Sequence, residues 1–144
     1  MTVYHFCSAK GMRGIRRKGI CEGVAVRREN DVLYMRYGYQ WVTLDGRHDA
    51  QSWATNVMIS EDRTAYRWTV EIPESETGSL LDRDGLDKAV PGCGQAFDGW
   101  DGSENWRVFS GRIPRKWLKK LDKWDENGWR EVWPCEKAAG DGAS

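Results

Sequence analysis

His5 is the first side chain of the sequence with an obvious chemical use, because it lies in the short apolar run 4–7 and is one of only two histidines. A neutral imidazole has one nitrogen that donates a hydrogen bond and one that accepts, which suits a ligand hydroxyl that does both. A histidine in a strand can also be structural, with its ring nitrogens bonded to backbone groups. Both roles are open for His5 when it is considered alone.

A run of cations follows His5 closely and consists of Arg13, Arg16, Arg17 and Lys18. Clustered cations attract phosphate, so this run could bind a pyrophosphate or the backbone of a nucleic acid. The alternative is the solvated face of a helix, which is often rich in charge.

The cysteines predict no metal site, because they are widely spaced, form no CxxC pair and have only two histidines to join them. No base adjacent to Cys7 or Cys21 marks either thiol as a nucleophile. The chain starts without the charged and apolar regions of a secretory signal, and no apolar run approaches the roughly 20 residues that cross a bilayer. We therefore expect a cytoplasmic protein with reduced thiols and no membrane partner.

The elements that would position these residues begin with a strand over residues 2–6, rich in β-branched and aromatic side chains. Ser8 can cap a helix over residues 9–18, which would end at Gly19. Residues 23–37 alternate imperfectly around Asn30-Asp31, which indicates a hairpin or an irregular excursion.

Further along the chain, residues 39–45, 64–72 and 104–109 predict three strands, and residues 49–57 a short helix. Residues 73–103 show little periodicity and predict a long surface loop. Pro114 suits the first turn of a helix, and Trp117, Leu118 and Leu121 follow at helical spacing. This mixture of elements predicts an α+β fold.

The size of the chain, 144 residues and 16.6 kDa, fits one domain, which we assign to residues 1–135 with a flexible tail over 136–144. The formal net charge is zero, so global electrostatics favours neither nucleic acid nor a membrane surface as a partner. The charge is unevenly distributed, since residues 1–28 are basic and residues 71–104 are acidic.

Three short motifs follow one another along the chain. The run 3–8 has an aromatic-His pair on a strand, followed by a helix and Gly19-Ile20. Residues 41–43 have an aromatic residue on a strand that leads into 50–54, and residues 103–108 continue to Arg112-Ile113-Pro114. In this order they resemble the three motifs of ADP-ribosyltransferase-like domains of the diphtheria-toxin and poly(ADP-ribose) polymerase class, the third as it is seen in DNA-ADP-ribosylating toxins. The resemblance implies a split, largely antiparallel sheet with a few short helices.

The resemblance also implies an activity and a set of roles. The protein would be an NAD-dependent ADP-ribosyltransferase, a bacterial toxin or phage effector that modifies a protein or nucleic-acid acceptor. Glu104 would stabilise the oxocarbenium-like state at the ribose, as a carboxylate does in glycoside hydrolysis. His5 would orient NAD through a ribose hydroxyl, and Trp41, or Tyr39 near it, would stack on the nicotinamide ring. Independently of the resemblance, Arg13 and Arg17 of the cation run would contact the pyrophosphate.

Three alternatives stay open. Glu71, on the strand over 64–72, competes with Glu104 as the third motif. The chain could also be an inactive member of the same fold that acts as a small inhibitor or interaction protein. A weaker possibility keeps the fold but changes the reaction, as in RNA 2′-phosphotransferases, which also consume NAD.

Overall fold

The N-terminal strand and helix form as the sequence predicts. In the computed structural model, which describes residues 1–55 and 62–134, β1 spans Thr2–Cys7 and α1 spans Ala9–Lys18. The Ser8 hydroxyl accepts a hydrogen bond from the Gly11 amide at 3.2 Å and so caps α1. The helix ends at Gly19, which has φ +82° and donates its N–H to the Ile15 carbonyl at 2.8 Å. A Cβ on Gly19 would lie 2.4 Å from the Ile113 carbonyl oxygen, so this close approach needs a glycine.

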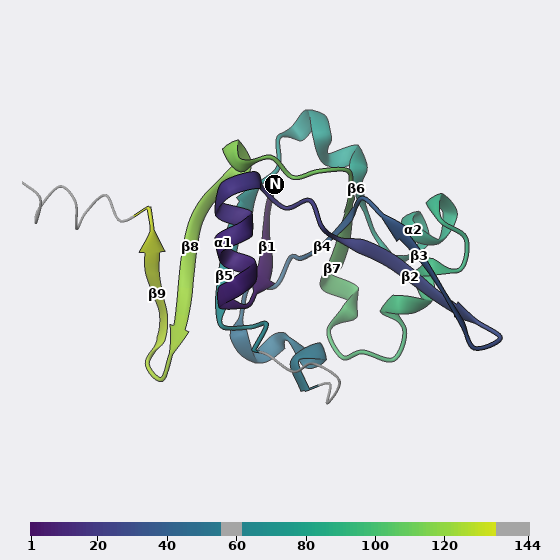
Figure 1. The fold of residues 1–144 in the computed structure, drawn as a ribbon, viewed down its shortest axis with the longest axis horizontal. Coiled ribbons are helices and arrows are strands. Elements are labelled where there is room, and N and C mark those ends of the chain that lie inside the picture. The colour runs from purple at the N-terminus through teal and green to yellow at the C-terminus, as the bar shows by residue number, and fades with distance from the viewer. Residues whose placement is uncertain (56–61, 135–144) are drawn as a thin grey trace, which may run out of the picture.

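The described part of the chain contains a seven-stranded antiparallel sheet with α1 on one of its faces (Figure 1). Its strands, in spatial order, are β6 (Leu80–Leu81), β7 (Trp106–Ser110), β4 (Tyr39–Thr43), β1, β5 (Tyr66–Glu71), β8 (Leu118–Asp125) and β9 (Gly128–Trp133). Met12 and Ile15 of α1 pack against the first core cluster, which includes Val3, Trp68 and Val70. The predicted alternation in the strand over 64–72 is confirmed by the burial of Trp68, Val70 and Ile72.

The sheet separates between β1 and β4. These two strands share one registered pair, Tyr4↔Thr43, whereas β1 and β5 share six. Beyond that pair the two strands diverge, and side chains from both face the space between them. This split is the structural basis of the site described below.

Residues 23–37 form a hairpin, one of the two predicted possibilities. β2 (Val24–Glu29) and β3 (Val32–Tyr37) pair antiparallel in a separate two-stranded sheet. Asn30 and Asp31 connect them with φ of 51° and 65°, as a two-residue type I′ turn requires. The hairpin projects from the body of the molecule (Figure 1).

The prediction of a long surface loop over residues 73–103 is wrong. This segment contains β6, helix α2 (Arg83–Ala89) and 3₁₀ turns at Glu74–Ser79 and Cys93–Phe97. Leu86, Val90, Cys93 and Phe97 are buried and form a second core cluster with Trp106 and Val108. Burial of these apolar side chains orders the segment.

The predicted helix after Pro114 is also wrong. Residues Arg115–Trp117 make one 3₁₀ turn, and the chain continues as β8 and β9.

The short helix predicted over 49–57 is described up to residue 55. There the chain forms two 3₁₀ turns, His48–Ala50 and Ser52–Thr55. The predicted tail over 136–144 lies outside the described residues.

The observed architecture is therefore mixed α+β, dominated by antiparallel strands and carrying few helices. No helix within residues 1–55 and 62–134 is long and apolar enough to span a membrane.

Candidate functional site

A cleft of about 900 Å³ opens where β1 and β4 diverge. Its walls come from the end of β1, from α1 and the segment after it, from β4, and from Trp53, Trp100 and Trp106. This volume lies in the range of small-molecule and cofactor sites, roughly 300–1,000 Å³. The cleft is the candidate site, and it contains His5, Trp41, Arg13 and Arg17 among the predicted residues.

His5 bridges the two diverging strands. Its Nδ1 lies 2.7 Å from the Trp41 carbonyl oxygen, and because a carbonyl can only accept, Nδ1 carries the proton. Burial lowers the pKa of His5 below its ordinary value, and the hydrogen bond to Trp41 opposes this only in part. The ring is therefore neutral at pH 7, and Nε2, which makes no hydrogen bond within the described residues, is left as an acceptor.

Trp41 combines a structural contact with a place in the cleft wall. Its indole N–H donates to the Val24 carbonyl at 3.0 Å, and its ring lies 5.2 Å from that of Phe97 and 6.1 Å from that of Trp106. These contacts hold the indole in one orientation beside the cleft. Tyr39, the predicted alternative to Trp41, packs against the same core cluster but does not line the cleft.

The cleft wall carries an excess of positive charge. The lining cations are Lys10, Arg13, Arg17, Lys18 and Arg63, and Glu22 is the lining acid among the described residues. Arg13 and Arg17 lie four residues apart and so share one face of α1, whereas Arg16 is not part of the wall. Such a wall favours an anionic ligand.

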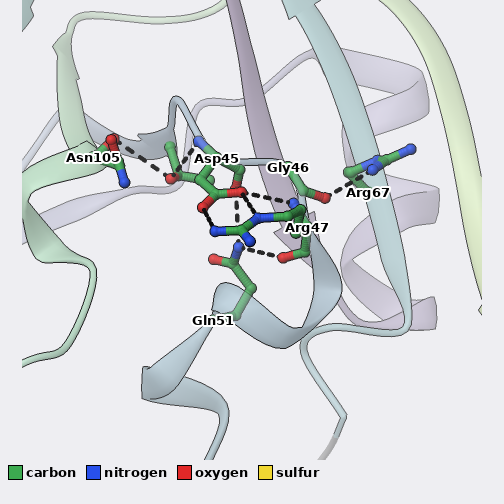
Figure 2. A network of polar contacts seen from close by, with 7 residues as sticks. Asp45, Gly46, Arg47, Gln51, Arg67 and Asn105 are labelled. Atoms are coloured by element: carbon green, nitrogen blue, oxygen red, sulfur yellow. Dashed lines mark hydrogen bonds and ion pairs between the residues drawn. The ribbon is translucent and has the colours of Figure 1, made fainter.

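The loop after β4 is held by a polar network that also supports the cleft (Figure 2). The Asp45 carboxylate accepts hydrogen bonds from Nε and Nη2 of Arg47 at 3.0 and 2.7 Å. These bonds lower the pKa of Asp45 below its ordinary value. The Gln51 amide donates to the backbone carbonyls of Asp45 and Arg47 at 2.9 and 2.8 Å. Gln51 also accepts from the indole N–H of Trp53 at 3.2 Å, so the network orients a tryptophan of the cleft wall.

The two carboxylates considered for the third motif do not line the cleft. Glu104 is exposed in the 3₁₀ turn Ser103–Asn105, directly before β7, whose first residue Trp106 is in the wall. Glu71 accepts hydrogen bonds from the Thr2 hydroxyl at 2.7 and 3.1 Å and lies 3.5 Å from the N-terminal amine. The bond from Thr2 is the main reason that the pKa of Glu71 is lowered.

Several cleft residues were assigned no function from the sequence. Gln51 and Trp53 lie in the stretch 50–54 of the second motif and Trp106 lies in the third motif, but none of them was given a role of its own, and Trp100 carried no signal. Tryptophans supply much of the core of this chain, and for that reason their type alone does not distinguish wall from core. His48, the second histidine of the chain, is not in the cleft wall; it is half-buried and stacks on Trp124 with ring centroids 4.0 Å apart.

Cys7 also lines the cleft, but its chemistry is suppressed. Burial raises the pKa of the Cys7 thiol to about 12, so it is protonated at neutral pH and a poor nucleophile.

Within the part of the chain that the structure describes, no three His, Cys, Asp or Glu side chains gather as they would around a metal ion.

Comparison of the chain with protein-family models, with curated proteins and with solved structures finds no match in any of the three. The cleft and its side chains are therefore the basis for a proposed function.

Proposed function

We propose that the cleft binds NAD and that the protein transfers ADP-ribose from it to a protein or nucleic-acid acceptor. The observation that carries the proposal is the convergence of His5, Trp41, Arg13 and Arg17 on one cleft of about 900 Å³. These residues come from β1, β4 and α1. The motifs assign His5 and Trp41 to NAD, and Arg13 and Arg17 belong to the cation cluster that could bind its pyrophosphate.

The chemistry of the wall supports a dinucleotide ligand. A dinucleotide offers two phosphates to the cations of α1, aromatic rings to the tryptophans and ribose hydroxyls to His5. With Nδ1–H committed to Trp41, Nε2 of His5 would accept a hydrogen bond from a ribose hydroxyl. The split, largely antiparallel sheet is in keeping with an ADP-ribosyltransferase-like fold, which we propose for this chain.

The proposed reaction breaks the bond between nicotinamide and C1 of its ribose, and the bonding pair leaves with nicotinamide. An acceptor nucleophile then forms a bond to C1 and loses its proton. A carboxylate near the ribose stabilises the positive charge that develops in between. Glu104 is the candidate, because it lies two residues before Trp106 of the cleft wall.

A second function, NAD binding without transfer, is favoured by one specific observation. The Glu104 side chain is exposed and outside the cleft, and Glu22, the lining carboxylate among the described residues, has a side chain that is 85% exposed and pairs with Lys18. A protein that binds NAD without a carboxylate at the ribose would be a binding or inhibitory member of the same fold.

Binding and transfer can be measured separately. Titration with NAD, followed by quenching of tryptophan fluorescence, reports binding because Trp41, Trp53, Trp100 and Trp106 line the cleft. Loss of one charge-assisted contact to phosphate costs about 1.5 kcal/mol, so Arg13→Ala and Arg17→Ala should each raise the Kd about tenfold. Arg16→Ala is the matched control, since it removes the same charge from the same helix outside the wall, and its Kd should be unchanged.

Transfer is measured with NAD labelled on the adenylate side and a cell lysate, together with nicotinamide release. Glu104→Gln should abolish both signals while leaving the NAD Kd unchanged, and Glu131→Gln on β9 is the control. If Glu71→Gln is the damaging change instead, the third motif is misassigned. Binding with no transfer in the wild-type protein would establish the second function, and the absence of binding would overturn both.

A further inference from the structure

β3 is the most exposed apolar element of the described chain. All six of its residues are exposed. The exposed large hydrophobic side chains among the described residues are Met1, Trp124 and five in β3, and those five are Val32 at 49%, Leu33 at 48%, Tyr34 at 45%, Met35 at 48% and Tyr37 at 69%. An apolar patch gathered on one element marks an interaction surface.

The outer edge of β3 is also open. In the described part of the chain β3 pairs with β2 alone. Glu29 and Val32 flank the two-residue turn and form a hydrogen-bonded pair, so the backbone groups of Val32, Tyr34 and Arg36 point to β2. Those of Leu33 and Met35 therefore point to the free edge. Natural edge strands are usually protected by charge, proline or a covering element, and residues 32–35 contain none of these.

We propose that β3 pairs with β3 of a second copy of this chain, antiparallel about a twofold axis, so that the two hairpins form one four-stranded sheet. A twofold axis perpendicular to a sheet keeps each face on its own side, so residues directly opposite must point to the same face. In the best register Tyr34 lies opposite Tyr34 of the partner subunit, and Leu33 lies opposite Met35 of the partner subunit. The two Leu33–Met35 pairs then use the outward-pointing backbone groups of both strands.

This register fits the side chains of both faces. On one face the two Tyr34 rings would meet, each already covered by its own Arg27, whose guanidinium lies 4.1 Å from the ring centroid. On the other face Leu33 and Met35 of the two copies would form an apolar cluster. Arg36 would lie opposite Val32 of the partner subunit. Because Glu29 pairs with Val32 within each hairpin, Arg36 would also lie near Glu29 of the partner subunit. No like charges face each other.

Two further observations favour a second copy over a different partner. The formal net charge of the chain is zero, so two copies approach without net repulsion. A shift of the register by two residues would place Asp31 opposite Met35, inside the apolar cluster, or Arg36 opposite Tyr34, whose neighbour on β2 is the like-charged Arg27. The strand is therefore complementary to itself in one register.

Sedimentation from low micromolar to several hundred micromolar protein tests the association. The wild-type chain should shift from monomer to dimer, and Leu33→Lys should raise the dimer dissociation constant by at least about tenfold, because it places a charge at the apolar centre. Gly78→Lys adds the same charge where a Cβ would meet no atom within 4 Å, and it should dimerise like wild type. A chain that stays monomeric throughout overturns the proposal, as does a Leu33→Lys variant that dimerises normally.

Cross-linking tests the register without destabilising the fold. Residues opposite each other in a non-hydrogen-bonded antiparallel pair have Cα atoms about 4.5 Å apart, a distance that a disulfide can span. Under a mild oxidant such as diamide, Tyr34→Cys should therefore form a covalent dimer. Tyr37→Cys, although more exposed, should cross-link far less, and the wild-type chain gives the background of its native thiols. Equal cross-linking at positions 34 and 37 would contradict the proposed pairing.

Discussion

At the scale of single residues, the hydrogen bond between His5 and Trp41 defines the chemistry of the site. It fixes the tautomer of the imidazole, joins the two strands at the point where they diverge, and leaves Nε2 as the acceptor. The same contact links two of the three motifs found in the sequence. The structural role of His5 is seen in this hydrogen bond, and the binding role that we propose would use Nε2.

The lowered pKa of His5 predicts how stability depends on pH. The unfolded chain binds a proton at His5 near pH 6.5, whereas the folded chain binds it only at lower pH. Between the two values the unfolded state holds more protons, so the free energy of unfolding falls as the pH is lowered, by at most about 1.4 kcal/mol per pH unit. Urea unfolding of wild type and His5→Asn between pH 7 and pH 5 measures this. The variant should lose part of the slope, and parallel curves would contradict the assignment.

At the scale of elements, one ion pair ties the second half of the sheet to the loop after β4. Arg67 on β5 donates to the Asp122 carboxylate on β8 at 2.7 Å and to the Gly46 carbonyl at 2.7 Å. Its guanidinium also lies 4.3 Å from the ring of Trp129 on β9. The Arg67 and Asp122 side chains are 14% and 3% exposed, so solvent screens the pair weakly.

Removal of Arg67 should therefore be costly. Arg67→Met leaves the Asp122 carboxylate buried without its main partner, a loss of about 3–5 kcal/mol in the free energy of unfolding. Arg130→Met is the control, because its pair with Asp125 is 3.8 Å long and exposed, and it should cost less than about 1 kcal/mol. Urea unfolding compares the two variants, and similar losses would show that burial of the pair is not what stabilises this junction.

The elements also show which parts of the fold local sequence signals could predict. Local signals were sufficient for β1, α1 and the β2–β3 turn, where caps, β-branched residues and Asn30-Asp31 act over a few residues. They failed for β8, because Val70 pairs with Leu118 while Thr69 pairs with Lys120, so Lys119 is the extra residue of a bulge. The bulge brings Leu118 and Leu121 to the same face of a strand. Their spacing of three residues therefore matched the period of a helix and led to the wrong prediction.

The second core cluster was missed for a different reason. Leu86, Val90, Cys93 and Phe97 recur at intervals of four, three and four, which is a helical signal. The glycines, acids and prolines around them indicated a loop, and only the packing of this segment against Trp106 and Val108 of β7 decides between the two. The same limit applies to the site, where His5, Trp41, Arg13 and Arg17 share the cleft, whereas Trp100 could be found only from the folded chain.

At the scale of the whole molecule, the cleft is lined by side chains of both core clusters. Cys7, Ile20 and Val42 belong to the first cluster, and Trp106 belongs to the second, against which Trp41 and Trp100 pack. The clusters share strands, since β7 contributes Phe109 to the first and Val108 to the second. A ligand in the cleft would contact both clusters.

This arrangement predicts that NAD stabilises the whole chain. At an NAD concentration one hundred times the Kd, binding to the folded state adds about 2.7 kcal/mol. A chain of this size gains about 2–4 °C in its midpoint per kcal/mol, so the Tm should rise by roughly 5–11 °C in a thermal scan. Combining Arg13→Ala with Arg17→Ala should abolish most of the rise at the same NAD concentration, whereas Arg16→Ala should keep it.

A variant in the second core distinguishes one cooperative unit from two. Leu86→Ala should cost about 2–5 kcal/mol and lower the midpoint without NAD, because Leu86 is fully buried. If both clusters unfold together, saturating NAD adds the same free energy of unfolding to this variant as to wild type, in a single transition. Two transitions, only one of which responds to NAD, would mean that the ligand is held by one cluster alone and that the cleft does not couple the two clusters.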